Sequence, residues 1–449
     1  MQKTFVENAQ QRIVIGANPL DAPAQEDMGF DASARSFSHA QIEAWQLSKL
    51  KEVCSYAKEN GSFYAEHFRG LNLDSIASRE EFSKLPRTTS ADISEAPFKF
   101  LCTSQDDIAR VVTLTTSGST GKPKRLYFTQ DELDETTAFY NHGMRCLVNA
   151  GDTVLALLPA PKPDSVGALL ADGLRQLGAN PVLNQDPDDV TASLTMLNEH
   201  SPDCVVGTSA HVLALVKLWK HQGGMNSPVK SVLLCWDANS RSIRKYIERI
   251  WDCRVHTHWG MTETGLGGAV SCAHSKGMHL RETNLYIEIT DPETGMVLPD
   301  GERGEIVVTT LTRKGMPLIR YRTGDESHIM TNACPCDSPL RQLSPNIRRI
   351  VQPSDTPDWF QFVTPTSIDR LLLSVPNFLA QQAQYWVAPN KLEVTVDMSE
   401  NSPQQLASVK ELLCDLVSPL HNAPDILCLP GRNDGKISIG FAKRKICVT

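Results

Sequence analysis

The sequence lacks both an excess of positive charge and a long apolar stretch. Its 44 lysine and arginine residues are outnumbered by 52 aspartates and glutamates, so the formal net charge is −8. Nucleic-acid-binding proteins usually present a basic surface, and proteins held on anionic membranes carry clustered lysines. No stretch of the sequence approaches the roughly 20 consecutive apolar residues that span a bilayer. We therefore expect neither a nucleic-acid partner nor a membrane partner.

A targeting signal is also missing from the first 30 residues. They contain no apolar core of signal-peptide length, and their acids and prolines argue against a transit peptide. We expect a cytoplasmic protein, in which most of the 12 cysteines are reduced. A cluster of cysteines would then indicate metal binding or catalysis rather than a disulfide framework. Nine cysteines stand alone in the sequence and are expected to be small buried residues: Cys54, Cys102, Cys146, Cys204, Cys235, Cys253, Cys414, Cys428 and Cys447.

The pattern along the chain predicts an α/β fold with more than one domain. A chain of 449 residues is too long for a single compact core. Residues 1–35 are polar and aperiodic, which predicts an extended or partly disordered arm. In residues 36–350 we expect a large domain, because short apolar runs alternate with helical stretches and so predict mostly parallel sheets flanked by helices. From Tyr286 onward, antiparallel strands with tight turns predict a β-rich subdomain within this large domain.

A different pattern follows the connector VQPSDTPDW, which begins at Val351. Its order is a helix, two strands, a second helix and a final strand over residues 436–445. This order predicts a small α+β C-terminal domain, residues 351–449, joined to the large domain by a hinge.

A glycine-rich loop lies between two apolar runs, at TTSGSTGKPK from Thr115 to Lys124. Backbone N–H groups and hydroxyls of such a loop can face phosphate oxygens, and its two lysines add positive charge. The loop is not a P-loop, because Thr116 and Pro123 stand where that motif needs glycine and Ser/Thr. A flexible hairpin turn is the alternative. The residues expected to contact phosphate are Thr116, Ser117, Gly118, Ser119, Thr120, Gly121, Lys122 and Lys124.

This loop resembles the signature loop of the superfamily that contains acyl-CoA synthetases, peptide-synthetase adenylation domains and luciferases. The resemblance covers nearly the whole chain, and the segment from Ser48 to Phe68, followed by EEFSKLPRTTSADI, looks most like phenylacetate–CoA ligases. It implies ATP- and Mg²⁺-dependent adenylation of a carboxylic acid, aryl or related, followed by transfer to coenzyme A with release of AMP and pyrophosphate. Monomer and homodimer stay open.

A second motif, WGMTET, begins at Trp259 and matches the family's aromatic-Gly-x-Thr-Glu element. The Trp259 ring can stack on adenine, the Thr262 hydroxyl can donate to the α-phosphate, and Glu263 can hold Mg²⁺. Gly260 and Met261 complete this part of the expected nucleotide site. Alone, a tryptophan beside glycine could equally be core packing at a turn.

Three further residues carry the resemblance toward the C-terminus. Asp325, in YRTGD, matches the aspartate that accepts hydrogen bonds from the ribose hydroxyls. Arg349 matches a ribose- or phosphate-contacting arginine at the hinge, with Arg348 nearly as good. Lys436, after a glycine, matches the lysine that neutralises charge as the acyl–adenylate forms, with Lys443 and Lys445 as competitors. The predicted catalytic residues are thus Lys436, Thr262 and Glu263.

Two segments depart from the family pattern. Cys235-Trp236-Asp237-Ala238 replaces a Gly-Ala-Glu-like stretch that lines adenine and substrate, so Asp237 and Ala238 are the residues expected there. The usual hinge run is replaced by VQPSDTPDW. These differences leave room for another acceptor, such as an amine, a carrier-protein thiol or a hydroxyl, or for a degenerate nucleotide-binding protein without activity. Residues lining the acid pocket are expected within 158–167 and 207–211.

The remaining cysteines suggest a metal site. Cys334 and Cys336 form a Cys-x-Cys pair, and Cys272 precedes two histidines, His274 and His279. Three thiolates and one imidazole would make a closed structural zinc site without an open position for catalysis. Some phenylacetate–CoA-ligase-like proteins carry such a zinc, and we favour His279 because it directly precedes the next strand. The alternative is a set of free thiols.

Overall fold

The structure is a computed structural model of the 449-residue chain. The residues that it describes are 18–29, 37–114, 123–160, 162–184, 186–236, 240–274, 276–350, 357–400, 402–432, 436–437 and 446–448. The predicted phosphate residues 116–122, together with Asp237 and Ala238, lie outside this part. The predicted domain boundaries after residues 35 and 350 lie in or beside residues 30–36 and 351–356, which the structure does not describe.

An eight-stranded sheet with the order β13-β9-β8-β7-β6-β5-β3-β4 forms the centre of the molecule. Its five parallel strands are β3 (Thr153–Leu157), β4 (Asn180–Leu183), β5 (Cys204–Thr208), β6 (Ser231–Cys235) and β7 (Arg254–Trp259). The helices between them are α7 (Val166–Leu177), α8 (Val190–His200), α9 (Ser209–His221) and α10 (Arg241–Trp251). Strands β5 and β6 are buried along their whole length, as expected of a sheet covered on both faces. The predicted α/β class is confirmed.

The sheet continues in antiparallel strands beyond β7. These are β8 (Ala269–Ser271), β9 (Met278–Leu280) and β13 (Gln342–Leu343). A second, antiparallel sheet contains β10 (Leu285–Thr290), β11 (Gly304–Thr310), β12 (Tyr321–Ser327) and β14 (Arg348–Arg349). This second sheet corresponds to the β-rich region expected from Tyr286 onward.

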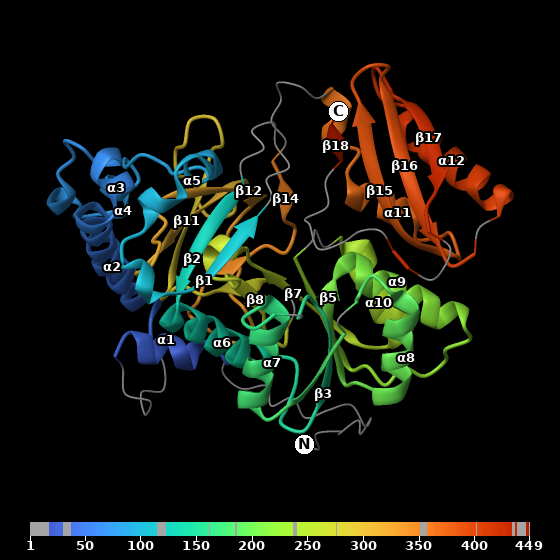
Figure 1. The fold of residues 1–449 in the computed structure, drawn as a ribbon, viewed down its shortest axis with the longest axis horizontal. Helices are drawn as coiled ribbons and strands as arrows, with labels where there is room; N and C mark the ends of the chain where they lie inside the picture. The colour runs from blue at the N-terminus through green and yellow to red at the C-terminus, as the bar shows by residue number, and fades with distance from the viewer. Residues whose placement is uncertain are drawn as a thin grey trace, which may run out of the picture.

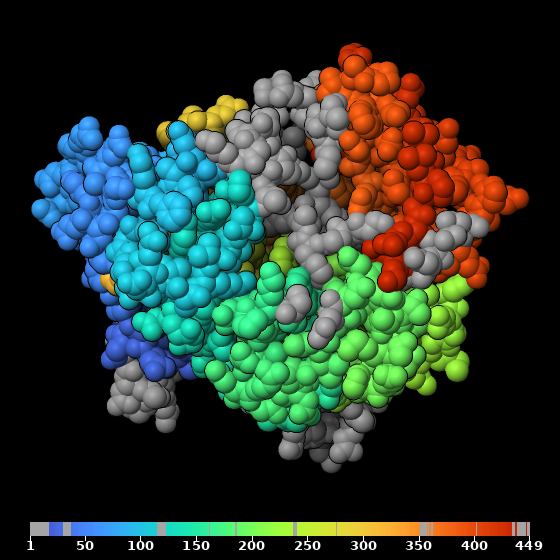
Figure 2. All heavy atoms as spheres, viewed as in Figure 1, coloured from blue at the N-terminus to red at the C-terminus, as the bar shows by residue number. Residues whose placement is uncertain are grey.

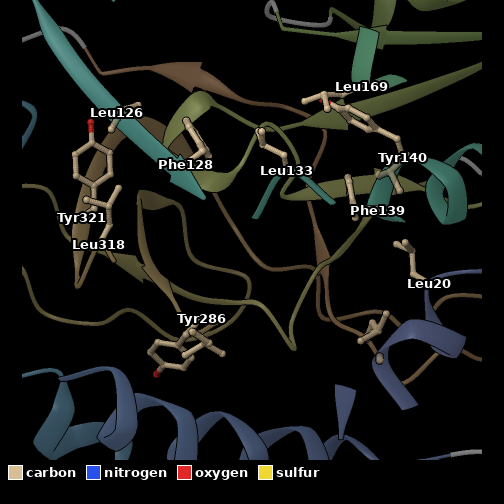
Figure 3. Packing of buried hydrophobic residues seen from close by; sticks show 14 of the residues in the cluster. Leu20, Leu126, Phe128, Leu133, Phe139, Tyr140, Leu169, Tyr286, Leu318 and Tyr321 are labelled. Atoms are coloured by element: carbon tan, nitrogen blue, oxygen red, sulfur yellow. The ribbon is translucent and has the colours of Figure 1, made fainter. Parts of the chain in front are cut away.

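A hairpin and a helix frame the glycine-rich loop. Strands β1 (Ile108–Leu114) and β2 (Lys124–Thr129) pair antiparallel, and α6 (Gln130–Met144) follows β2 directly. Helix α6 was not predicted from the sequence, although Thr129 and Glu132 form a capping box at its start. Figure 3 shows Leu126 and Phe128 of β2 near Leu318 and Tyr321, so the hairpin packs on the chain that enters β12.

The N-terminal region is mainly short helices. These are α1 (Asp21–Asp27), α2 (His39–Asn60), α3 (Ser62–His67), α4 (Arg79–Phe82) and α5 (Ser90–Glu95), with single 3-10 turns at Leu73–Ser75, Pro97–Phe100 and Gln105–Asp107. Helix α2 begins at a Ser38 capping box. The expectation of an extended or disordered arm is wrong for residues 18–29. Leu20 and Ala24 are buried, and Asp27 accepts a 2.5 Å hydrogen bond from Thr283. One helix of seven residues is too short to show a periodicity in the sequence.

The last hundred residues form a small α+β module around a sheet with the order β17-β16-β15-β18. Its elements are a 3-10 turn at Asp358–Gln361, α11 (Pro365–Leu372), β15 (Phe378–Trp386), β16 (Lys391–Met398), α12 (Pro403–Val417), β17 (Asp425–Pro430) and β18 (Cys447–Val448). Strand β17 was not predicted. Of the expected strand at 436–445, the structure describes only Lys436 and Ile437.

The small module lies directly on the large domain. In Figures 1 and 2 its orange and red elements rest on α9 and α10, shown in green. One apolar cluster includes Val212 and Val216 of α9 together with Phe378 and Leu379 of β15. This contact explains why α9 is buried on every side except at its last turn. Among the described helices, none is long and apolar enough to cross a membrane.

Candidate nucleotide-binding site and metal centre

The parallel strands end together at one edge of the sheet, where ligands of open α/β sheets usually bind. Strand β5 ends at Thr208, β6 at Cys235 and β7 at Trp259. Trp236 follows β6 with a φ of 70°, so the chain turns sharply at the position where the sequence departs from the family. The predicted Thr-Glu pair begins a 3-10 turn, Thr262–Thr264, just beyond β7.

A lysine, a glutamate and a tyrosine meet at this edge from three segments. Lys124, at the end of the glycine-rich loop, forms a buried ion pair with Glu263. Tyr321 of β12 donates a 3.0 Å hydrogen bond to the same Glu263 oxygen, and Lys124 Nζ is 3.2 Å from the Tyr321 hydroxyl. Burial would raise the pKa of Glu263, but the charge of Lys124 and these hydrogen bonds outweigh it and lower the pKa. Glu263 is therefore a carboxylate, as a magnesium ligand must be.

Arg313 and Glu132 support this group, and neither was predicted from the sequence. Arg313 donates a 2.9 Å hydrogen bond to the backbone carbonyl of Glu263, and its guanidinium lies 3.6 Å from the Glu132 carboxylate. The guanidinium also stacks on the Phe128 ring at 4.3 Å. All of these side chains are buried. No motif marks Arg313, and only the N-cap pattern before α6 draws attention to Glu132.

The predicted ribose residues also come together. Trp259 donates its indole N–H to one oxygen of Asp325 at 3.1 Å, and Arg349 donates to the other oxygen at 2.9 Å. Asp325 is buried, whereas the Arg349 side chain is about half exposed. Gly324 has a φ of 70°, and a β-carbon there would lie 3.0 Å from the Arg349 guanidinium. Of the two arginines that the sequence left open, Arg349 is therefore the one beside Asp325, and Arg348 lies opposite Glu326.

The Trp259 ring is mostly enclosed by its own core. Its exposed fraction is 4%, and it belongs to an apolar cluster with Leu280 and Leu285. Stacking of this ring on adenine stays a prediction. Gly260, Met261 and Thr262 are partly exposed beside it, and a Met261–Thr264 hydrogen bond of 3.1 Å fixes their turn.

Lys436 lies at the same edge of the sheet but above other strands. Its ammonium group is 3.3 Å from the Asp189 carboxylate and 3.8 Å from that of Asp186, in the segment between β4 and α8. The neighbouring Asp188 carboxylate lies 2.8 Å from His211 Nε2, at the start of α9. Lys436 thus lies against the segment between β4 and α8, and Asp188 of the same segment reaches the start of α9, which follows β5.

Three cysteines and one histidine form a compact cluster away from these residues. The ligand atoms of Cys272, His279, Cys334 and Cys336 all lie within 4.8 Å of one another. The Cys272 and Cys334 sulfurs are 3.5 Å apart, and Cys336 is 3.3 Å from His279 Nε2. Tetrahedral zinc with the usual bond lengths places its ligand atoms about 3.4 to 3.8 Å apart. The donor set and its spacing therefore fit zinc.

The surroundings of the cluster favour this chemistry. His279 Nδ1 lies 3.0 Å from the Leu340 carbonyl, which fixes the proton on Nδ1 and leaves Nε2 to bind a metal. The hydrogen bond with Cys336 and the nearby His279 lower the pKa of Cys272, which favours its thiolate form. Burial raises the pKa of Cys334. His274, the alternative ligand, is not part of the cluster.

Comparison with known proteins defines the class. The family model "AMP-binding enzyme" matches residues 56–312, more than half of the chain, and the protein belongs to this family. The chain is 26% identical over 452 residues to a phenylacetate–coenzyme A ligase from Aromatoleum evansii, an alignment that covers 95% of this chain and 98% of the relative. A ligase of the same name from Thermus thermophilus is 25% identical over 366 residues, covering 78% of this chain and 79% of the relative.

Solved structures agree on the fold. A 2-hydroxyisobutyryl-CoA ligase in the postadenylation state, in complex with 2-HIB-AMP, superposes with a TM-score of 0.76 at 19% identity. The superposition covers 97% of this chain and 96% of that chain. The predicted relationship to adenylate-forming enzymes, and to phenylacetate–CoA ligases in particular, is confirmed. The predicted activity, an AMP-forming acid–thiol ligase, agrees with the family model and with the names of these ligases.

Proposed function

We propose that the protein activates a carboxylic acid with ATP and transfers the acyl group to coenzyme A, releasing AMP and pyrophosphate. The observation that carries this proposal is the arrangement around β7. Lys124, Glu263, Asp325 and Arg349 come from four separate segments and form two carboxylate–cation pairs at one edge of the sheet, in which both carboxylates are buried. Such an edge suits a ligand that is both anionic and hydroxyl-rich, as a nucleotide is.

In the first step, a carboxylate oxygen of the acid attacks the α-phosphorus of ATP, and the bond to the leaving pyrophosphate breaks. Asp325 would accept hydrogen bonds from the ribose while Arg349 keeps its carboxylate oriented. Thr262 would donate to the α-phosphate, and Lys436 would neutralise charge on the acyl and phosphate oxygens. In the second step, the thiol attacks the acyl carbonyl and AMP leaves with the electrons of the acyl–phosphate bond.

Glu263 is the residue that we propose as the magnesium ligand. Mg²⁺ is commonly held by one or two carboxylates plus substrate phosphates, so a single glutamate suffices. When bound, it would neutralise charge on the phosphates. In the structure, the Glu263 carboxylate is paired with Lys124. Nucleotide phosphates offer Lys124 replacement partners, so it can leave Glu263 without losing a counter-ion.

Zinc on Cys272, His279, Cys334 and Cys336 is proposed as a structural ion. Four protein ligands leave no position for substrate. The cluster joins the loop after β8 to the loop after β12, the strand that carries Asp325. Zinc would therefore fix the part of the chain behind the ribose-binding residues.

The relatives' names make phenylacetate and related aryl acids the first substrates to test. Transfer to an amine, a carrier-protein thiol or a hydroxyl is the second candidate, because the hinge and the Trp236 segment depart from the family. The cytoplasmic location stays a prediction; it would suit an enzyme that uses ATP and coenzyme A.

Acid-dependent exchange of labelled pyrophosphate into ATP, measured over a panel of aryl and alkyl acids, tests the first step. Thioester formation measured with and without coenzyme A tests the second. Exchange together with thioester formation supports the proposal. Exchange without a thioester moves the function to another acceptor, and no exchange with any acid of the panel contradicts adenylation.

A further inference from the structure

A short acidic segment between β4 and α8 receives the C-terminal lysine. It contains Asp186, Asp188 and Asp189, and the backbone of Lys436 and Ile437 lies along it. Ile437 donates its N–H to the Asp188 carbonyl at 2.8 Å, and Lys436 forms an antiparallel bridge with Asp189. The small module therefore touches the large domain through main-chain bonds at the residue predicted to be catalytic.

The aspartate side chains of this segment have different partners. Asp188 points to His211 Nε2 at 2.8 Å, and His211 Nδ1 lies 2.8 Å from the Thr208 hydroxyl, so the segment is tied to the end of β5. Asp189 accepts from the Ala192 N–H at 2.8 Å and caps α8. Its other oxygen faces Lys436 at 3.3 Å. The lysine therefore meets a carboxylate whose own position is fixed by a helix.

We propose that Asp189, assisted by Asp186, is a positioning residue that holds the Lys436 ammonium at the carboxyl-terminal edge of the central sheet, where adenylation is proposed to occur. The inference rests on the proposed function, in which Lys436 acts in the first step. Main-chain bonds hold Lys436 against the segment between β4 and α8, and the two carboxylates set the direction of its flexible side chain. The lysine side chain is a flexible four-carbon stem. Holding its ammonium group in one place before the reaction reduces the conformational entropy that is lost when it reaches the transition state.

Exposure predicts which aspartate matters more. The Asp189 side chain is 23% exposed, whereas that of Asp186 is 63% exposed. Ion pairs with exposed partners contribute little because water screens them. We therefore expect Asp189 to dominate and Asp186 to add a smaller effect.

The test uses the full-length variants Asp189→Asn, Asp186→Asn and the double variant. Asparagine keeps the cap of α8, because its side-chain oxygen still accepts a hydrogen bond. The rate of acid-dependent pyrophosphate exchange should fall about 10-fold in the double variant, with Asp189→Asn giving most of the loss. Thioester formation from a chemically prepared acyl-adenylate should stay unchanged. Asp172→Asn, an exposed partner of Arg175 on α7, is the matched control and should change neither rate.

The outcomes distinguish the positioning role of the aspartates from the role of Lys436 in adenylation. A double variant with normal or faster exchange overturns the positioning role, and so does an equal loss in both half-reactions, which would indicate general docking. Lys436→Ala tests the proposed function independently. If it exchanges pyrophosphate normally, the role of Lys436 itself fails. If it is inactive while the double aspartate variant is normal, only the positioning inference fails.

Discussion

Lys124 and Glu263 are 139 residues apart in the sequence and form a buried ion pair at the end of the central sheet. The pair joins the two motifs that sequence alone marked as nucleotide-binding. Tyr321 completes it by donating to Glu263, and burial together with the Glu263 charge raises the pKa of Tyr321 well above its ordinary value. The tyrosine therefore stays a hydrogen-bond donor at any physiological pH.

Removing only one charge of this pair should lower the free energy of unfolding more than removing both charges. Lys124→Met leaves the Glu263 carboxylate buried without its cation, and we expect the free energy of unfolding to fall by about 3 to 5 kcal/mol. The double variant Lys124→Met/Glu263→Gln should recover much of that loss but remain inactive in pyrophosphate exchange. Urea denaturation measures the stability of each variant.

Lys49→Met is the matched control for this cycle, because Lys49 pairs with Glu52 on the surface. Its loss should change the free energy of unfolding by less than about 1 kcal/mol. Strictly additive losses at Lys124 and Glu263 would show that the two side chains do not interact in solution.

Asp325→Asn should weaken nucleotide binding selectively. The amide loses the ion pair with Arg349 and accepts hydrogen bonds from ribose more weakly than a carboxylate. We expect the KM for ATP to rise at least about 10-fold, equivalent to about 1.4 kcal/mol, with little change in the KM for the acid. Glu326→Gln, the next residue of β12, should leave both constants unchanged because its partner is Arg303. An equal rise in both constants would argue against a ribose contact.

The cysteine–histidine cluster predicts one equivalent of bound zinc per chain. Cys336→Ser should abolish most of the bound metal and lower the thermal midpoint, since structural zinc contributes directly to folding. Cys428→Ser, a cysteine of β17 outside the cluster, should keep its metal. Metal analysis of the purified proteins decides the question, and less than half an equivalent in the unmodified protein would count against a zinc site.

Lys217 of α9 contacts the small module, and we expect the contribution of this contact to the free energy of unfolding to depend on pH. It is buried and donates to the carbonyls of Leu373 and Val375 at 3.0 and 2.6 Å, beyond the end of α11. Burial lowers the pKa of Lys217 from 10.5 to about 7. Between those values the unfolded chain binds more protons than the native one, so the free energy of unfolding should rise with pH. Below pH 7 this contribution stops changing.

Thermal midpoints of the unmodified protein and of Lys217→Met, compared between pH 7 and pH 9, measure this effect. The midpoint difference between the two should move in favour of the unmodified protein as pH rises. Lys220→Met removes an exposed lysine one turn further along α9 and should show no such trend. A difference that is independent of pH would refute the assignment to Lys217.

The sequence predicted those parts of the site that motifs and periodicity carry. Trp259, Glu263, Asp325 and Arg349 lie within short patterns with fixed spacing, and the structure places them in two neighbouring groups. The parallel strands were also evident, because fully buried strands are continuous apolar runs. Even the metal cluster followed from residue type, since few side chains other than cysteine and histidine bind zinc.

The supporting residues could not be predicted in the same way. Arg313 acts on a backbone carbonyl 50 residues away, and Asp189 meets a lysine from another part of the fold. Neither contact has a local pattern, because it depends on how distant segments dock. Helix α1 was missed for a similar reason. It is held by Leu20 and Ala24 against the core and by Asp27 on Thr283, and not by its own propensity.

The central claim, that a carboxylate oxygen of the substrate attacks the α-phosphorus of ATP, is tested most directly with an acid labelled with oxygen-18 in its carboxylate. Phenylacetate is the first acid to use, with coenzyme A present and the released nucleotide examined by mass spectrometry. The account predicts that AMP is the nucleotide product and carries one atom of oxygen-18. Release of ADP with the label in inorganic phosphate, or of AMP without the label, would contradict it.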